Sequence, residues 1–161
     1  MCPIPTPGAA DTGGADPAVA AALSEYYRTG ATGKALAALS RSRVLVAVTA
    51  VADGPSGADS ASLATVLSTG VDGRQALLAF TCLDALMRWQ PTARPVPQPM
   101  RSAARAALRE GAVALVVDLA GPVPLTIQGD DLQQLAAGLV LVPTADGHTW
   151  ALPGAALRPW P

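Results

Sequence analysis

The fold is decided by residues 74–127, RQALLAFTCLDALMRWQPTARPVPQPMRSAARAALREGAVALVVDLAGPVPLTI. This stretch opens on the apolar run Arg74–Phe80 and closes on two more, Ala112–Val117 and Val123–Ile127. Short apolar runs bounded by turn residues predict strands, and the continuous middle run predicts a strand buried on both faces. Helical spacing of apolar residues between these runs predicts that helices pack on the resulting sheet.

Local signals mark the ends of the two helices that we expect inside this stretch, Thr81–Gln90 and Met100–Glu110. Thr81 and Asp84 form a Thr-x-x-Asp pair, which predicts that Thr81 caps the first helix. Gly111 stands where a C-terminal cap of the second helix is expected. The prolines at positions 91, 95, 97 and 99 predict a stiff, extended connector between the helices.

The N-terminal side of the chain adds further elements. In chain order these are helices Ala18–Arg28 and Gly33–Ser40, strand Arg43–Ala52, a flexible loop Asp53–Ser60 and strand Leu63–Ser68. The pair Asp72-Gly73 is typical of a hairpin turn and predicts that the last of these strands pairs with the run at Arg74.

The C-terminal side predicts one helix and one hairpin. Asp130 is expected to cap a helix that runs to Ala137. Strands Leu139–Val142 and Thr149–Leu152 are expected to pair around the Asp-Gly turn at residues 145–147.

These elements predict a single α+β domain, with a mixed, mostly antiparallel sheet flanked by helices. Residues 1–16, rich in proline and glycine, predict a disordered leader. The folded domain is expected at 17–142 and a C-terminal hairpin and tail at 143–161.

Composition excludes several classes of function. The net charge is −1, from 11 basic and 12 acidic residues, so the chain lacks the basic footprint of a general nucleic-acid binder. Cys2 and Cys82 cannot build a disulfide framework. The N-terminus has no signal-peptide pattern and no apolar run is long enough to cross a bilayer, so we expect a cytoplasmic protein that binds no membrane.

The usual catalytic constellations are absent from the sequence. His148 is the single histidine, and neither a nucleophile elbow nor a phosphate-binding loop has the required spacing. Cys82 lies at an expected helix start, where a thiol can become reactive, but a helix-capping role is the favoured interpretation. We therefore expect no enzyme, no metal and no cofactor.

Asp118 directly follows the buried strand predicted at Ala112–Val117. Strand ends in open α/β sheets are common ligand sites, so a small-ligand pocket near Asp118 is one interpretation. The favoured interpretation is an aspartate that begins the turn at Ala120-Gly121-Pro122.

Basic residues with helical order form the remaining candidate site. Arg101, Arg105 and Arg109 recur every four residues and predict a stripe along one side of their helix. Arg88, Trp89 and Arg94 precede the stripe, so the segment could bind carboxylates or phosphates of a partner. For the stripe taken alone, a solvated helix face is the favoured interpretation.

The order of these motifs resembles the N-terminal domain of the SseB family. The resemblance is carried by ALLAFTCLDAL at 76–86, WQP at 89–91, ARPVP at 93–97, EGA at 110–112, LVVD at 115–118 and AGPV at 120–123, within about residues 18–137. The family is named for enhanced serine sensitivity, and the resemblance implies no established reaction or catalytic residue. Cys82 replaces a serine expected by the resemblance, which supports its capping role.

Three hypotheses follow. The leading one is a cytoplasmic bacterial protein-interaction or regulatory domain that uses the Trp89–Arg109 surface. The second is a small-ligand sensor or unrecognised enzyme with a pocket near Asp118. The third is a homodimer joined through the C-terminal hairpin around Trp150.

Overall fold

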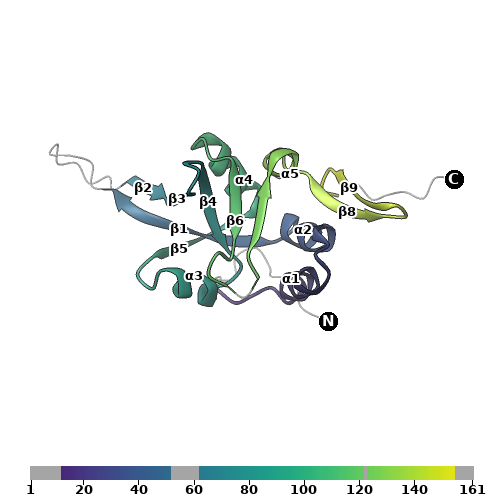
Figure 1. The fold of residues 1–161 in the computed structure, drawn as a ribbon, viewed down its shortest axis with the longest axis horizontal. Coiled ribbons are helices and arrows are strands. Elements are labelled where there is room, and N and C mark those ends of the chain that lie inside the picture. Colours follow the sequence, from purple (N-terminus) through teal and green to yellow (C-terminus); the bar gives the residue numbers. More distant parts are fainter. Residues whose placement is uncertain (1–11, 52–61, 122, 155–161) are drawn as a thin grey trace.

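The computed structural model describes residues 12–51, 62–121 and 123–154, and Figure 1 shows their arrangement. The loop predicted at Asp53–Ser60 and the first eleven residues of the predicted leader lie outside the described residues. The helices are α1 Pro17–Thr29, α2 Thr32–Ser40, α3 Leu83–Trp89, α4 Met100–Arg109 and α5 Gly129–Ala136. The strands are β1 Arg43–Val51, β2 Ser62–Thr65, β3 Leu67–Thr69, β4 Gln75–Phe80, β5 Arg94–Pro99, β6 Ala114–Val117, β7 Leu125–Gln128, β8 Val140–Thr144 and β9 Gly147–Ala151.

Seven of these strands form one sheet, in which the path β2-β1-β4-β6-β7 is extended by β3 beside β4 and β5 beside β1. Only β4 and β6 pair in parallel, and every other neighbouring pair is antiparallel. Strands β8 and β9 form a separate hairpin. The predicted α+β fold with a mixed, mostly antiparallel sheet is confirmed.

The sheet separates two apolar clusters of unequal size. Val44 and Val46 of β1 belong to the larger cluster, whereas Leu45 belongs to the smaller one, as alternation along a strand requires. Helices α1, α2, α4 and α5 contribute to the larger cluster, and α3 contributes to the smaller one. Figure 1 shows α3 and α4 on opposite sides of the sheet.

The proline-rich segment is part of the sheet rather than the simple connector that we predicted. Strand β5 pairs antiparallel with β1 over six residues, from Arg43↔Pro99 to Val48↔Arg94. Its prolines occupy every second position, 95, 97 and 99. Proline has no N–H to donate, and alternate residues of a strand direct their backbone groups to opposite sides. With this spacing the prolines occupy the positions on the side away from β1, and the intervening residues can pair with it.

The predicted hairpin before Arg74 forms, but its first strand is divided. Strand β3 pairs with β4 across the turn, and the N–H of Gly70 donates to the carbonyl of Arg74 at 2.8 Å. Strand β2 pairs instead with β1. The single strand predicted at Leu63–Ser68 therefore contributes to two neighbours.

Three predicted helix caps are wrong, and one of them is Cys82, which stands at the start of α3 but makes no side-chain cap hydrogen bond. Helix α3 begins after Cys82, and the Thr81 hydroxyl donates to Asp118 rather than capping the helix. The Leu83 N–H has no acceptor within the helix at this first turn, and it donates to the carbonyl of Gly13 at 2.8 Å. Helix α5 begins after Gln128, which makes no side-chain cap, and Asp130 lies within its first turn.

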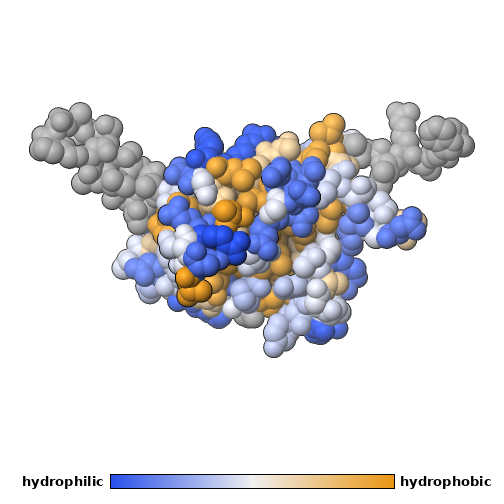
Figure 2. Space-filling view, turned by 45° about the horizontal axis from the view of Figure 1, so that its top comes forward, coloured by the Kyte–Doolittle hydropathy of each residue, from blue (hydrophilic) through white to orange (hydrophobic). Residues whose placement is uncertain are grey.

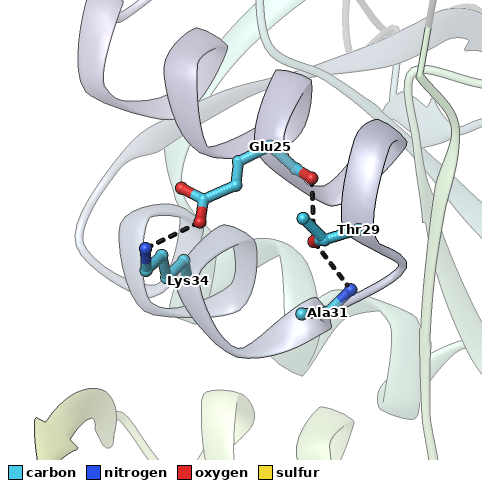
Figure 3. A network of polar contacts seen from close by, with 4 residues as sticks. All are labelled: Glu25, Thr29, Ala31 and Lys34. Atoms are coloured by element: carbon cyan, nitrogen blue, oxygen red, sulfur yellow. Dashed lines mark hydrogen bonds and ion pairs between the residues drawn. The ribbon is translucent and has the colours of Figure 1, made fainter.

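The first two helices are joined by a short turn with polar contacts on both sides. The ammonium of Lys34 lies 2.7 Å from a Glu25 carboxylate oxygen, and the Thr29 hydroxyl accepts from the Ala31 N–H at 3.2 Å (Figure 3). Gly30 ends α1 in the left-handed conformation, at φ 72°. Helix α2 in turn contacts strand β8 of the C-terminal hairpin.

The C-terminal hairpin is confirmed, with β8 and β9 paired from Val140↔Ala151 to Thr144↔Gly147. The N–H of Leu141 donates to the Ser40 hydroxyl at 3.1 Å, and Leu141 lies in the larger cluster. Strand β8 spans the boundary at 142 that we predicted between domain and tail, and this division stays a prediction.

Candidate functional site

Asp118 lies where the parallel strands β4 and β6 end side by side. Its N–H donates to the Ala79 carbonyl at 2.9 Å, which extends the pairing of the strands by one residue. One carboxylate oxygen accepts the Thr81 N–H at 2.8 Å and the other accepts the Thr81 hydroxyl at 2.6 Å. The side chain therefore joins the end of β6 to the start of the segment that leads into α3.

Asp118 is buried, and its backbone is held in a tight turn. The residue is 4% exposed, and burial raises the pKa of its carboxyl above the usual 3.8, against the lowering effect of the Thr81 hydrogen bonds. Asp118 has a φ of 53°, a conformation that aspartate adopts more readily than most residues. A Cβ added at Gly121 would lie 2.9 Å from the Asp118 Cβ, so the turn needs glycine there.

These contacts give Asp118 an architectural role. Arg43 donates to the Thr81 carbonyl at 2.7 Å and to the Gly14 carbonyl at 2.6 Å, so the same cluster holds the segment before α1. Asp118 lines neither of the two cavities described below. The turn at residues 118–121 is present, closed by the Gly121 N–H on the Asp118 carbonyl at 2.9 Å.

The six residues predicted to bind a partner do not form one surface. Arg88 and Trp89 lie on α3, and the arginine stripe lies on α4 across the sheet. Arg94 begins β5 at the sheet margin. Any partner that used all six would have to contact two faces and an edge.

Two members of this set make contacts within the chain. Trp89 is half-buried on the smaller cluster, and its ring centroid lies 5.5 Å from that of Phe80. Arg105 donates through Nε to the Ala136 carbonyl at 2.6 Å, where α4 meets the end of α5. Arg101 and Arg109 are exposed, and neither makes a hydrogen bond or ion pair within the described ranges.

The larger cavity has a volume of about 380 Å³ and opens between the start of α4 and the C-terminal hairpin. Its wall combines two arginines with serine and aliphatic residues, among them Arg41, Ser42, Arg101, Leu139, Val140 and Leu152. None of the lining residues in the described part of the chain is acidic. The sequence pointed to Arg101 but not to Arg41. The two residues line one cavity because the pairing of β5 with β1 brings their segments together.

A smaller cavity of about 260 Å³ lies on the other side of the sheet, over β4, β6 and β7. Leu78, Val116 and the half-exposed Leu119 supply its apolar part. Asp72 and Arg74 line its rim and pair with one another, so their charges are already satisfied. Asp72 and Arg74 therefore leave no unpaired charge for a ligand of this cavity.

The residues with metal-binding or nucleophilic chemistry do not assemble into a centre. No three His, Cys, Asp or Glu side chains come together as a possible metal site in residues 12–51, 62–121 and 123–154. Cys82 is half-buried at the start of α3 beside the smaller cluster. His148 is exposed on β9, where its ring lies so close to Gly33 that an added Cβ would meet Nδ1 at 2.5 Å.

No helix in the described ranges is both long and apolar enough to span a bilayer. Comparison with curated proteins found no match, and comparison with solved structures found none. The family model described as SseB protein N-terminal domain matches residues 19–134, from α1 into α5. This match covers both the buried Asp118–Thr81 cluster and the α4 stripe. The chain therefore belongs to the SseB family, through the N-terminal domain of that family.

Proposed function

We propose that this domain is a non-enzymatic, cytoplasmic protein-interaction domain that binds an acidic partner surface along α4. The observation that carries the proposal is the pair of exposed guanidinium groups at Arg101 and Arg109. Neither has a partner within the described part of the chain, whereas Lys34 pairs with Glu25 and Arg74 pairs with Asp72. Guanidinium groups left free on one helix suit carboxylates supplied from outside.

Two further features support a surface that binds rather than catalyses. One face of helix α4 packs in the core, so its outer face lies on a well-packed helix. The buried residues are Met100, Ala103, Ala104 and Ala107. Figure 2 shows a face of the molecule on which polar and apolar residues alternate over short distances. A non-obligate interface is about as apolar as the rest of a protein surface, so a mixed face of this kind is compatible with binding.

The proposal is tested by reversing charge on α4 and comparing it with an equal reversal elsewhere. The variant is Arg101→Glu with Arg109→Glu, and Arg105 stays in place because it holds the Ala136 carbonyl. The matched control is Arg28→Glu with Arg88→Glu, two exposed arginines on α1 and α3. Partners are captured from the native cell and quantified by mass spectrometry, with circular dichroism to verify folding.

We expect at least one protein to be retained by the wild type and the control and lost by the α4 variant. Replacing two favourable contacts by two repulsive ones is expected to weaken binding at least tenfold. The proposal is overturned if every captured protein survives the α4 reversal. It is also overturned if both variants lose the same proteins equally, because the effect would then be one of net charge.

A further inference from the structure

We propose that the larger cavity binds a small amphipathic anion, a carboxylate or phosphate ester carried on a short aliphatic body. The cavity volume, about 380 Å³, lies within the usual range of small-molecule sites, roughly 300–1,000 Å³. This function goes beyond the proposed partner surface, because it depends on a concave site at one end of α4 and on Arg41, which is not part of that helix.

Charge determines the sign of the ligand. Arg41 and Arg101 both line the cavity, and no aspartate or glutamate among the described residues does. Neither guanidinium makes a hydrogen bond or ion pair within residues 12–51, 62–121 and 123–154. Two unpaired cations that line the same cavity repel one another, and an anion bound in the cavity offsets this repulsion and supplies hydrogen-bond acceptors.

Backbone hydrogen bonds fix the positions from which the two arginine side chains extend. The Met100 N–H donates to the Ser42 carbonyl at 3.1 Å and joins the segment after α2 to the start of α4. Strand pairing between Arg43 and Pro99 fixes the same junction from the next residue on each side. Arg41 and Arg101 are thus carried by neighbouring, hydrogen-bonded segments, which favours a preformed site.

Apolar residues determine the rest of the ligand. Leu139, Val140 and Val142 line the cavity from the segment after α5, and Leu152 lines it from the end of β9. The bond from the Leu141 N–H to the Ser40 hydroxyl holds this wall against α2. A purely inorganic anion would leave these side chains in contact with water, so an aliphatic body adds affinity.

The probes are hexanoate and hexyl phosphate, with hexanamide as an uncharged molecule of matched shape. Each is titrated into the full-length, isotopically labelled protein and followed by NMR. We expect both anions to shift the backbone resonances of residues 138–142 together with those of Arg41 and Arg101. We expect hexanamide to bind about tenfold more weakly, since it lacks the charge-assisted hydrogen bonds.

Four variants test the ligand site, and those at Arg41, Val140 and Arg109 separate it from the partner surface, since Arg101 belongs to both. Arg41→Gln and Arg101→Gln are each expected to weaken anion binding about tenfold. Arg109→Gln removes the same charge from α4 outside the cavity and is expected to leave anion binding unchanged. Val140→Phe keeps the charge and fills the cavity, so it is expected to weaken all three probes.

The outcomes are distinguishable. Tighter binding of hexanoate identifies a carboxylate ligand, and tighter binding of hexyl phosphate identifies a phosphate ester. The proposal is overturned if neither anion gives a saturable shift below about 10 mM, the weak end of specific affinity. It is also overturned if hexanamide binds equally well, or if Arg109→Gln weakens binding as much as Arg41→Gln. Loss of anion binding with an intact captured partner leaves the proposed partner surface standing.

Discussion

Two charged regions meet at the same end of the sheet, and they are used in opposite ways. At the ends of β4 and β6, Asp118 is buried and both of its oxygens accept hydrogen bonds from Thr81. Beside the start of β1, Arg41 and Arg101 are exposed around a cavity and make no bond within the described ranges. Arg43 lies between the regions and belongs to the first, through its bond to the Thr81 carbonyl.

The comparison shows that position at a strand end does not by itself make a ligand site. A buried charged group is tolerated in a protein when its hydrogen bonds are satisfied internally, and the Asp118 carboxylate meets this condition. Charged groups that remain unpaired in a concave site are available to a ligand. The first region should therefore control stability and the second should control binding, and each prediction below tests this division.

The largest effect is expected from Asp118→Ala. The change leaves the Thr81 N–H and hydroxyl without acceptors inside the protein, and each unsatisfied buried donor costs about 1–3 kcal/mol. Alanine also tolerates the positive φ of 53° less well than aspartate. We expect the free energy of unfolding, measured with urea, to fall by about 3 kcal/mol.

Asp118→Asn is the matched variant for this prediction. Asparagine keeps one amide oxygen as an acceptor and tolerates a left-handed backbone, so its loss should be clearly smaller than that of alanine. Anion binding in the larger cavity should be unchanged in the folded protein. An Asp118→Ala protein as stable as the wild type, to within about 0.5 kcal/mol, would show that the cluster is not structural.

A smaller effect is expected from Arg105→Ala, which divides the α4 stripe into its structural and free members. Loss of the bond to the Ala136 carbonyl should lower the free energy of unfolding by about 1 kcal/mol, because the arginine is partly solvated. Arg109→Ala, which removes an exposed and unpaired guanidinium, should change it by less than about 0.5 kcal/mol. Equal losses in the two variants, measured by urea unfolding, would contradict the division.

The sequence predicted the elements better than it predicted their contacts. Helical periodicity and the apolar runs placed α4 and β6, since these signals depend on neighbouring residues alone. The pairing of β5 with β1 was missed because prolines suggest a connector, and only the edge position makes their alternation compatible with a strand. Thr81 was assigned to the nearest helix start, whereas its acceptor is Asp118, distant in the chain.

The candidate sites follow the same rule. The α4 stripe could be predicted because its spacing is local. The bond from Arg105 to the Ala136 carbonyl and the shared cavity of Arg41 and Arg101 depend on tertiary packing. The third hypothesis, a dimer through the hairpin, meets a similar limit. Trp150 is half-buried against the larger cluster, so part of its apolar surface is already used within the chain.

The smallest effect concerns the pH dependence of stability in the first region. Burial raises the pKa of Asp118 in the folded protein above its usual 3.8, so folding favours the protonated carboxyl. For a raised pKa, the stabilising contribution is complete below the unfolded value and is lost as pH rises through the folded pKa. The wild type should therefore lose stability relative to Asp118→Asn between pH 3.8 and the folded pKa, and the difference should be constant at higher pH. Urea unfolding of both proteins across this range measures the effect. A difference that instead grows in favour of the wild type as pH rises would mean that the Thr81 hydrogen bonds outweigh burial and hold the carboxylate ionised.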